Sequence, residues 1–437
     1  MDKEIKDLMQ KIENAGEEVY IVGGAVRDLL LNREVKDWDF TTNLEPEKIL
    51  KIFPKKSFYN NEFGTVGVVG KNNVVYEITT FRTDVGYSDS RHPDEVKWGK
   101  TLQEDVERRD FTINAMAMDV DGKIYDFFDG ENDLKNKTIR AVGVADTRFK
   151  EDALRMMRAI RIACQLKFLI EKETFEAIER NASLLSNISS ERIRDELFLI
   201  LKSDSPVEGI LLLKNSGLLR EIIPELLEGL EMEQKGHHIF DVFKHNLEAL
   251  RNCESKNVIT RLACLLHDVG KPKSLYVKDG ERTFHNHEVI GSRIAVRIGR
   301  RLKLSNKELD QLFKLVRWHM FTTGEMVTDK AVRRFIKNVT PEYLDEMISL
   351  RRADRIGSGA KETSWRWELF KKRLVEVQKQ PFSIKDLKIN GEDVMKIKKI
   401  KPGREVGIIL KKIFEKVEED PSLNKRSTLL KLLKEKN

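Results

Sequence analysis

The spacing of apolar residues divides the chain into two parts. Up to about residue 140, short runs rich in β-branched residues alternate with glycine turns, as at 66–69, 74–81 and 115–120, and this pattern predicts strands. After Glu151, apolar residues recur at positions i, i+3 and i+4 almost throughout, which predicts helices. The sequence therefore predicts an α/β head followed by an all-helical remainder.

Composition divides the helical remainder further. Seven of the eight histidines lie between His237 and His319, and Lys and Arg outnumber Asp and Glu from Lys361 onward. We therefore expect four parts. They are a head over 1–140, a helical neck over 141–235, a histidine-rich helical block over 236–360 and a basic helical tail over 361–437.

The bulk composition excludes several classes of protein. The chain lacks the run of roughly 18 uncharged apolar residues that a transmembrane helix needs, and residues 1–10 alternate charged and apolar positions without a signal-peptide core. The three cysteines, Cys164, Cys253 and Cys264, are too scattered for a disulfide framework or a zinc knuckle. We expect a cytoplasmic protein with reduced thiols and no membrane segment.

The charge balance is basic. The formal net charge is +7 and the pI is near 9.0, and the surplus comes from the tail. A basic helical segment is either a solvated surface or a binding surface for a phosphate backbone. Composition leaves both interpretations open.

The head contains a glycine turn followed by two acids. We expect Tyr20–Val22 to be a strand that enters the Gly23-Gly24 turn, and 26–31 to be a helix whose first N–H groups face a triphosphate. Asp37 and Asp39 are spaced by two, so on a strand they would share one face. Carboxylates paired in this way can hold Mg²⁺ together with substrate phosphates. The pattern favours nucleotidyl transfer.

A charged stripe is predicted at the start of the helical remainder. Asp152, Arg155, Arg158 and Arg161 are three residues apart and would share one helix face. Such a face is often only solvated and held by i, i+3 ion pairs. Cytosine and adenine, however, each present an exocyclic amino donor beside a ring-nitrogen acceptor, so a carboxylate and a guanidinium could select these bases without a nucleic-acid template. The residues alone leave both interpretations open.

The clustering of histidines favours a metal site. Proportional scattering would place far fewer of them in this short stretch of the chain. The spaced set of possible ligands is His245, His267-Asp268, His287, His319 and Asp354. His237, His238 and His285 have no assigned role.

Five motifs occur in order over the first 200 residues. They are Gly23 to Asp28 with the Asp37/Asp39 pair, Arg108 to Ala115, Phe128 to Gly130 with Asp133-Leu134 and Ile139-Arg140, Glu151 to Arg155, and Glu191 to Ile193 with Glu196-Leu197. Together they resemble the motifs of bacterial class II tRNA nucleotidyltransferases, the CCA-adding enzymes, and of the related bacterial poly(A) polymerases. The resemblance implies a polymerase-β-like head, with a small mixed sheet and helices, followed by an all-α neck, an HD domain and a tail.

The resemblance also implies roles for individual residues. Asp37 and Asp39 would be catalytic and bind Mg²⁺, and Asp152 with Arg155 would form the protein template that reads the base. The other nucleotide-binding residues implied are Gly24, Arg27, Arg109, Asn114, Arg158 and Arg161. Arg109 could instead be a surface charge and Asn114 a structural cap. Glu77, on its predicted strand, is a candidate third acid.

Within the family, the segment 82–93 resembles the flexible loop of full CCA-adding enzymes. Its Gly, Ser, Asp and Pro residues predict a mobile loop. The resemblance implies that this loop helps the pocket switch from CTP to ATP. We therefore expect CCA addition rather than A-only addition or poly(A) synthesis.

The histidine block resembles the HD-domain metal-dependent phosphohydrolases. His245, His267, Asp268 and Asp354 match the minimal ligand set, while His287 and His319 match positions used for a second ion. The resemblance implies 2′,3′-cyclic phosphodiesterase or phosphatase chemistry with a second divalent metal. The alternative is a degenerate HD fold kept as a helical scaffold.

Taken together, the sequence predicts template-independent addition of C, C and A to the 3′ end of tRNA from CTP and ATP. A rival of a different class is an HD-type phosphohydrolase whose head only binds nucleotide. The intact Asp37/Asp39 pair argues against that rival. A third possibility, an RNA-binding protein without chemistry, rests on the basic tail alone.

Overall fold

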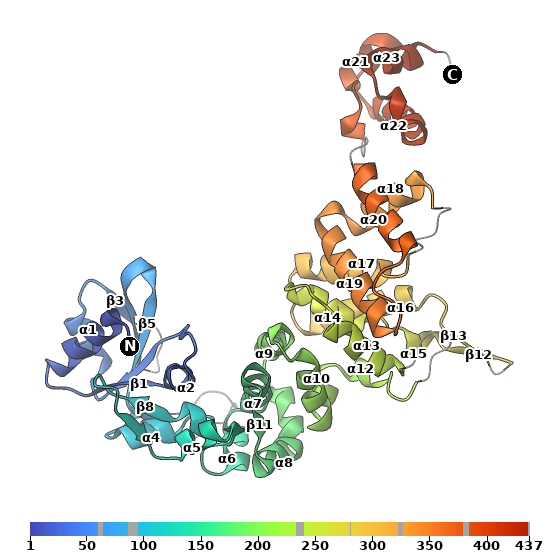
Figure 1. Ribbon diagram of the computed structural model, residues 1–437. Helices are drawn as coiled ribbons and strands as arrows, with labels where there is room; N and C mark the ends of the chain where they lie inside the picture. Colours follow the sequence, from blue (N-terminus) through green and yellow to red (C-terminus); the bar gives the residue numbers. More distant parts are fainter. Residues whose placement is uncertain are drawn as a thin grey trace. The chain divides into compact units, whose positions relative to one another are not determined.

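A seven-stranded mixed sheet forms the centre of the head (Figure 1). The strand order is β3-β4-β5-β2-β1-β8-β9; β2 pairs with β5 in parallel, and the other pairings are antiparallel. The strands are β1 (Val19–Val22), β2 (Asp39–Thr42), β3 (Ser57–Tyr59), β4 (Thr65–Val69), β5 (Val75–Thr80), β8 (Met116–Met118) and β9 (Ile124–Asp126), and a separate hairpin is formed by β6 (Arg82–Val85) and β7 (Glu95–Trp98). The α/β head predicted from the apolar pattern is confirmed.

The helices of the head alternate with its strands along the chain, and those of the neck come after the head. In the head they are α1 (Lys3–Glu13), α2 (Gly24–Leu30), α3 (Pro46–Ile52), α4 (Leu102–Glu107) and α5 (Gly130–Lys135). After them come α6 (Ala145–Glu151), α7 (Leu154–Leu166), α8 (Lys172–Asn181), α9 (Ser190–Lys202), α10 (Pro206–Asn215), α11 (Leu218–Ile222) and α12 (Pro224–Leu227), with a two-strand pair of β10 (Thr138–Ile139) and β11 (Leu169–Ile170).

Among the described residues after α12, the chain is helical apart from one hairpin (Figure 1). Its helices are α13 (Val242–Arg251), α14 (Val258–Leu266), α15 (Lys271–Ser274), α16 (His287–Arg301), α17 (Asn306–Trp318), α18 (Asp329–Val339), α19 (Leu344–Gly357), α20 (Trp365–Gln378), α21 (Gly391–Lys398), α22 (Arg404–Glu419) and α23 (Arg426–Lys434), and the hairpin is β12 (Tyr276–Lys278) with β13 (Glu281–Thr283). Short 3₁₀ helices are η1 (Lys71–Asn73), η2 (Thr112–Asn114), η3 (Ala182–Asn187), η4 (Pro341–Tyr343), η5 (Ile384–Asp386) and η6 (Pro421–Leu423).

The computed structural model describes residues 1–59, 64–85, 95–232, 240–279, 281–321, 327–378 and 384–435. By packing, the chain divides into a first unit, Met1–Leu227 with Arg300–Lys303, and a second unit, Glu228–Gly299 with Leu304–Asn437. Most of the predicted loop 82–93, together with His237 and His238, lies outside the described residues. None of the described helices has the length and apolar character that crossing a membrane requires.

Two local features of the first unit differ from the sequence prediction. Gly23 adopts a left-handed conformation with φ of 73°, so the chain turns there and α2 begins at Gly24 rather than at residue 26. Within the stretch that the apolar pattern predicted to be helical, Gly217 has φ of 81° and separates α10 from α11. In both cases a glycine permits a conformation that side chains with a Cβ rarely adopt.

Separate apolar cores stabilise the head and the tail. In the head, a cluster under the sheet joins strands β1 and β8 to helix α4, and its buried members are Val22, Phe81, Leu102, Val106, Ala115, Ala117 and Val142. In the tail, α21, α22 and α23 bury their own cluster, which includes Val394, Phe414, Val417 and Leu429. The tail helices therefore bury apolar surface among themselves and leave their lysines on the outside.

Candidate active site and candidate metal centre

The glycine turn, the first residue of β2 and an arginine meet at one edge of the sheet. A Cβ on Gly23 would lie 2.8 Å from Nη1 of Arg109 and 3.8 Å from Oδ2 of Asp39. The positive φ at Gly23 favours glycine there, and a Cβ would also require the Arg109 guanidinium to shift. Arg109 is positioned by the fully buried Asp105, which lies 3.6 Å from it and also accepts the Thr41 hydroxyl of β2.

Asp37 does not lie on the strand, and this corrects the prediction that both acids share a strand face. The register with β1 begins at Asp39, because β1 ends at Val22 where Gly23 turns the chain. Asp37 lies in the segment before the strand and is exposed, whereas Asp39 is half-buried. The two carboxylates nevertheless interact: burial raises the pKa of Asp39, Arg109 opposes the rise, and Asp37 adds to it by repulsion.

Glu77 lies beside Asp39 in the parallel pairing of β2 with β5. Residues opposite each other in such a register project from the same face of the sheet. This places a third carboxylate on the strand next to Asp39, as the sequence suggested for Glu77.

A chain of hydrogen bonds connects the glycine turn to helix α7. Arg27 donates to Oδ1 of Asn114 at 2.8 Å, and Asn114 donates to Oδ1 of Asp110 at 3.1 Å. The other oxygen of Asp110 accepts two bonds from Arg158, at 2.8 and 2.6 Å. Burial disfavours ionisation of Asp110, but Arg158 and Asn114 outweigh it and hold its pKa well below the usual range. The buried carboxylate of Asp110 therefore joins α2, η2 and α7.

The residues predicted to read the base lie at a junction between two helices. α6 ends at Glu151, Asp152 has extended backbone angles and α7 begins at Leu154. The prediction that Asp152 shares a helix face with Arg155 is therefore wrong, and the two side chains do not form the i, i+3 ion pair considered from the sequence. Asp152 accepts the N–H of Leu154 at 3.0 Å instead, as polar residues do at helix starts.

Each arginine of α7 has a carboxylate partner from another turn or element. Arg155 pairs with Glu151 at 2.7 Å and donates to the carbonyl of Arg108, and Arg161 pairs with Glu196 at 3.0 Å. Sequence reasoning did not single out Asp105, Asp110, Arg192 and Glu196 as site residues. Three of them lie in the ordered motifs at 108–115 and 191–197, so the sequence did contain a sign of them. The spacing of a motif does not indicate which arginine each carboxylate contacts.

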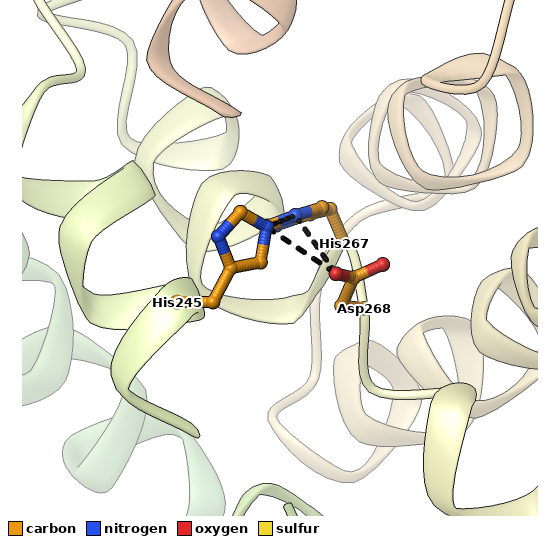
Figure 2. Close-up of side chains that lie close together, drawn as sticks. All are labelled: His245, His267 and Asp268. Carbon is orange, nitrogen blue, oxygen red and sulfur yellow. Dashed lines mark hydrogen bonds and ion pairs between the residues drawn. The ribbon is translucent and has the colours of Figure 1, made fainter. Parts of the chain in front are cut away.

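Six buried side chains from five helical segments meet in the second unit: they lie on α13, α16 and α19 and at the ends of α14 and α17. Two groups could hold a metal ion: His245, His267 and Asp268 on one side (Figure 2), and Asp268, His287 and His319 on the other. The ligand atoms of each group lie within 4.8 Å of one another. Asp354 lies 3.2 Å from Nε2 of His245. Asp268 belongs to both groups, so it could bridge two ions.

The imidazoles are oriented for metal binding. Nδ1 of His267, His287 and His319 each lies 2.8 Å from a backbone carbonyl, of Cys264, Phe284 and Val316 respectively. A carbonyl only accepts, so Nδ1 carries the proton and Nε2 of a neutral ring presents a lone pair. Nε2 of His287 and His319 then face each other at 3.4 Å. Two nitrogens bound to one ion at about 2.1 Å in tetrahedral geometry lie about this far apart.

Charged partners around this centre offset the cost of burying its ionised groups. Burial disfavours ionisation of Asp268, but Lys271, whose Nζ lies 2.5 Å away, and His267 outweigh it and hold the pKa of Asp268 well below its usual range. Burial disfavours the charged ring of His245, but Asp268 and Asp354 outweigh it and raise its pKa to about 9. A cation is therefore favoured between these acids. His285 is exposed and remains without an assigned role.

Family comparisons agree with this arrangement. The chain matches models described as the poly A polymerase head domain over residues 19–140, the probable RNA- and SrmB-binding site of polymerase A over 167–230, the HD domain over 231–357, and tRNA nucleotidyltransferase domain 2 over 295–433. The CCA-adding enzyme of Ligilactobacillus salivarius is 34% identical, and the alignment covers 99% of this chain and 97% of that protein. The chain belongs to the CCA-adding enzyme family.

Other relatives match in part or in fold. The CCA-adding enzyme of Lactobacillus johnsonii is 50% identical over 49% of this chain, and the match spans about half, 54%, of that relative's length. The crystal structure of the Bacillus stearothermophilus CCA-adding enzyme in complex with CTP superposes with a TM-score of 0.73 at 29% identity, covering 99% of this chain and 97% of that one. The Thermotoga maritima CCA-adding enzyme complexed with tRNA, at 22% identity and a TM-score of 0.63, shares the fold.

Replacing Asp110 by Asn should destabilise the first unit. The change removes the charge that holds Arg158, and we expect a loss of about 2 kcal/mol near pH 7, since Arg158 retains some access to water. The pKa of Asp110 is depressed in the folded chain, so its contribution is complete above the unfolded value of about 3.9 and is lost as the pH falls. Calorimetry from about pH 2 to 7 should therefore show a constant difference in stability between the two proteins down to about pH 4 and a shrinking difference below it.

A matched control for this pair is Asp146→Asn. Asp146 also pairs with an arginine, Arg180, but that pair is exposed and screened by water. Asp146→Asn should change stability much less. Equal effects of the two substitutions would contradict the importance given to the buried pair.

Replacing Gly270 by Ala should disturb the histidine centre. The added Cβ would lie 2.1 Å from the carbonyl oxygen of His287 and 2.5 Å from the backbone N of Gly291, so the loop after Asp268 and the start of α16 must separate. Overpacking of this kind costs about 1–3 kcal/mol. We expect lower stability and at least a halving of the metal bound per chain, measured by elemental analysis after loading with Mn²⁺.

Gly407 offers the control. It lies in α22, where a Cβ would meet nothing within 4 Å, so Gly407→Ala should be neutral or slightly stabilising through higher helix propensity. Unchanged metal content in the Gly270 variant would show that the close approach does not align the centre.

Proposed function

We propose that this chain adds C, C and A to the 3′ end of tRNA, using CTP and ATP without a nucleic-acid template. The observation that carries the proposal is the continuous frame from the glycine turn to α7. Through Arg27, Asn114, Asp110 and Arg158, it joins α2, which follows the glycine turn, to α7, which begins two residues after Asp152. The names of the relatives support the same activity.

The residues at the sheet edge fit Mg²⁺. Asp37, Asp39 and Glu77 offer carboxylate oxygens, which Mg²⁺ prefers, and the upward pKa shift of Asp39 beside Asp37 indicates a place where a cation relieves repulsion. When bound, Mg²⁺ neutralises charge that develops on the phosphates. In the reaction, the 3′-hydroxyl of the RNA attacks the α-phosphorus of the nucleotide, and pyrophosphate leaves.

The other residues hold and select the nucleotide. Gly24 and Arg27 hold the triphosphate with backbone N–H groups and a guanidinium, and Arg158 and Arg161 extend the positive surface toward it. Asp152 accepts from the exocyclic amino group of cytosine or adenine, and Arg155 donates to the ring nitrogen. The remaining contacts come from Arg109, and Asn114 shapes the pocket.

The four-part division assigned from the sequence gives each part a role. The head (1–140) is catalytic, the neck (141–235) reads the base, the HD block (236–360) binds metal, and the basic tail (361–437) contacts the tRNA backbone through its exposed lysines. With tRNA, CTP and ATP as substrates, we propose a cytoplasmic location for the protein.

Replacing Asp39 by Ala should abolish nucleotide addition. The metal would lose a ligand, and we expect a loss of at least about a hundredfold in the rate of incorporation. The measurement is a single incubation of trimmed tRNA with each nucleotide and Mg²⁺, resolved nucleotide by nucleotide. The wild-type chain should add two C residues and then A.

The exposed Asp121, in the turn between β8 and β9, provides a matched control, and Asp121→Asn should leave addition unchanged. Unimpaired addition by the Asp39 variant would contradict the proposed mechanism. Incorporation of ATP but never of CTP by the wild type would show an A-adding enzyme or a poly(A) polymerase instead.

A second candidate activity is hydrolysis of phosphate esters at the histidine centre. The facing Nε2 atoms and the shared Asp268 favour it, since a centre kept only as scaffold has no need for lone pairs directed at one another. The residues fit one or two divalent ions, which would lower the pKa of bound water. The substrates expected are 2′,3′-cyclic phosphates or phosphate monoesters.

Replacing Asp268 by Asn should empty the centre of metal. The carboxylate is common to both ligand groups, so its loss should lower both metal content and hydrolysis of a 2′,3′-cyclic nucleotide to background, while CCA addition persists. Asp310→Asn on the exposed side of α17 is the control and should retain both. Equal, near-zero metal in wild type and variant would remove this candidate activity.

A further inference from the structure

One family motif has no role in the scheme above. The segment 191–197 lies on α9, which packs against α7. Arg192 and Glu196 are four residues apart and so share a helix face. Both reach residues assigned to the nucleotide: Arg192 pairs with Asp152 at 2.8 Å, and Glu196 pairs with Arg161 at 3.0 Å.

Arg192 contacts both oxygens of the Asp152 carboxylate. Its Nη2 donates to Oδ2 at 2.8 Å, and its Nη1 lies 3.4 Å from Oδ1. Oδ1 also accepts the N–H of Leu154 at 3.0 Å. A carboxylate offers about four lone-pair positions, so these three contacts leave one, on Oδ2.

We propose that Arg192 is a specificity-determining positioning residue for nucleotide selection. The inference rests on the proposed function, in which Asp152 reads the base. Because Arg192 contacts both oxygens, it fixes the plane of the Asp152 carboxylate. The remaining lone pair of Asp152 is then directed toward the amino group of cytosine or adenine. Uracil and guanine present a carbonyl oxygen at that position, which the fixed carboxylate repels.

The geometry of the pair explains why an arginine is needed. The planar guanidinium presents two N–H groups that match the two oxygens of a carboxylate, whereas a lysine ammonium is a point charge that leaves the carboxylate free to rotate. Arg155, the other base-reading residue, is held separately by Glu151 and the carbonyl of Arg108. The carboxylate and the guanidinium of the template are thus oriented by independent partners and not by each other.

The test compares Arg192→Gln and Arg192→Lys with the wild type. The quantity measured is kcat/KM for CTP, ATP, UTP and GTP on trimmed tRNA. We expect Arg192→Gln to lower the preference for CTP and ATP over UTP and GTP by at least about tenfold, with Arg192→Lys in between, since each lost charge-assisted bond weakens discrimination. A purely structural role would instead lower all four values by the same factor.

Arg194→Gln is the matched control on the same helix. Arg194 pairs with its neighbour Asp195 and not with Asp152, so its removal should preserve the preference. Unchanged discrimination in both folded Arg192 variants, checked by thermal melting, would overturn the inference while leaving CCA addition intact. Absence of C and A addition by the wild type would overturn the proposed function itself.

Discussion

The first unit depends on the hydrogen bonds and the ion pair made by one buried carboxylate, that of Asp110. It accepts bonds from the Phe111 N–H, from Asn114 and from Arg158, and so ties the loop after α4 to α2 and α7. An ionised group with so little access to water is stable only when its lone pairs are satisfied. Because Asn114 also accepts a bond from Arg27, the same contacts hold α2, which follows the glycine turn, against α7.

A site that binds a triphosphate and a base needs many arginines, and arginines placed close together repel. In the first unit this repulsion is relieved because each of these arginines forms an ion pair with an acid. The pairs are Arg27 with Asp28, Arg155 with Glu151, Arg158 with Asp110 and Arg161 with Glu196. Ion pairs of this kind add little stability on a surface. Here their value is orientation, because the side chains are held in place before a nucleotide arrives.

In the second unit, histidine side chains are also oriented by hydrogen bonds. Backbone carbonyls at the ends of α14 and α17, and just before α16, fix the protonated nitrogen of each ring and leave Nε2 directed inward. The close approach of Gly270 to the start of α16 brings His287 to the same side as Asp268. The geometry of the candidate metal centre therefore depends on one glycine and three carbonyls as well as on the side chains that could bind the ion.

By itself, the sequence determined the α/β head, the helical remainder, the two acids and the histidine set, because apolar periodicity and residue type are local properties of the chain. It placed the strands β1, β4, β5 and β8 close to where they lie. Tertiary structure decided that Asp37 precedes its strand, since strand length depends on the partner β1, which ends at Val22. It also decided that Asp152 meets Arg192 rather than Arg155, because a contact across 40 residues follows from the packing of α7 on α9 and leaves no trace in spacing.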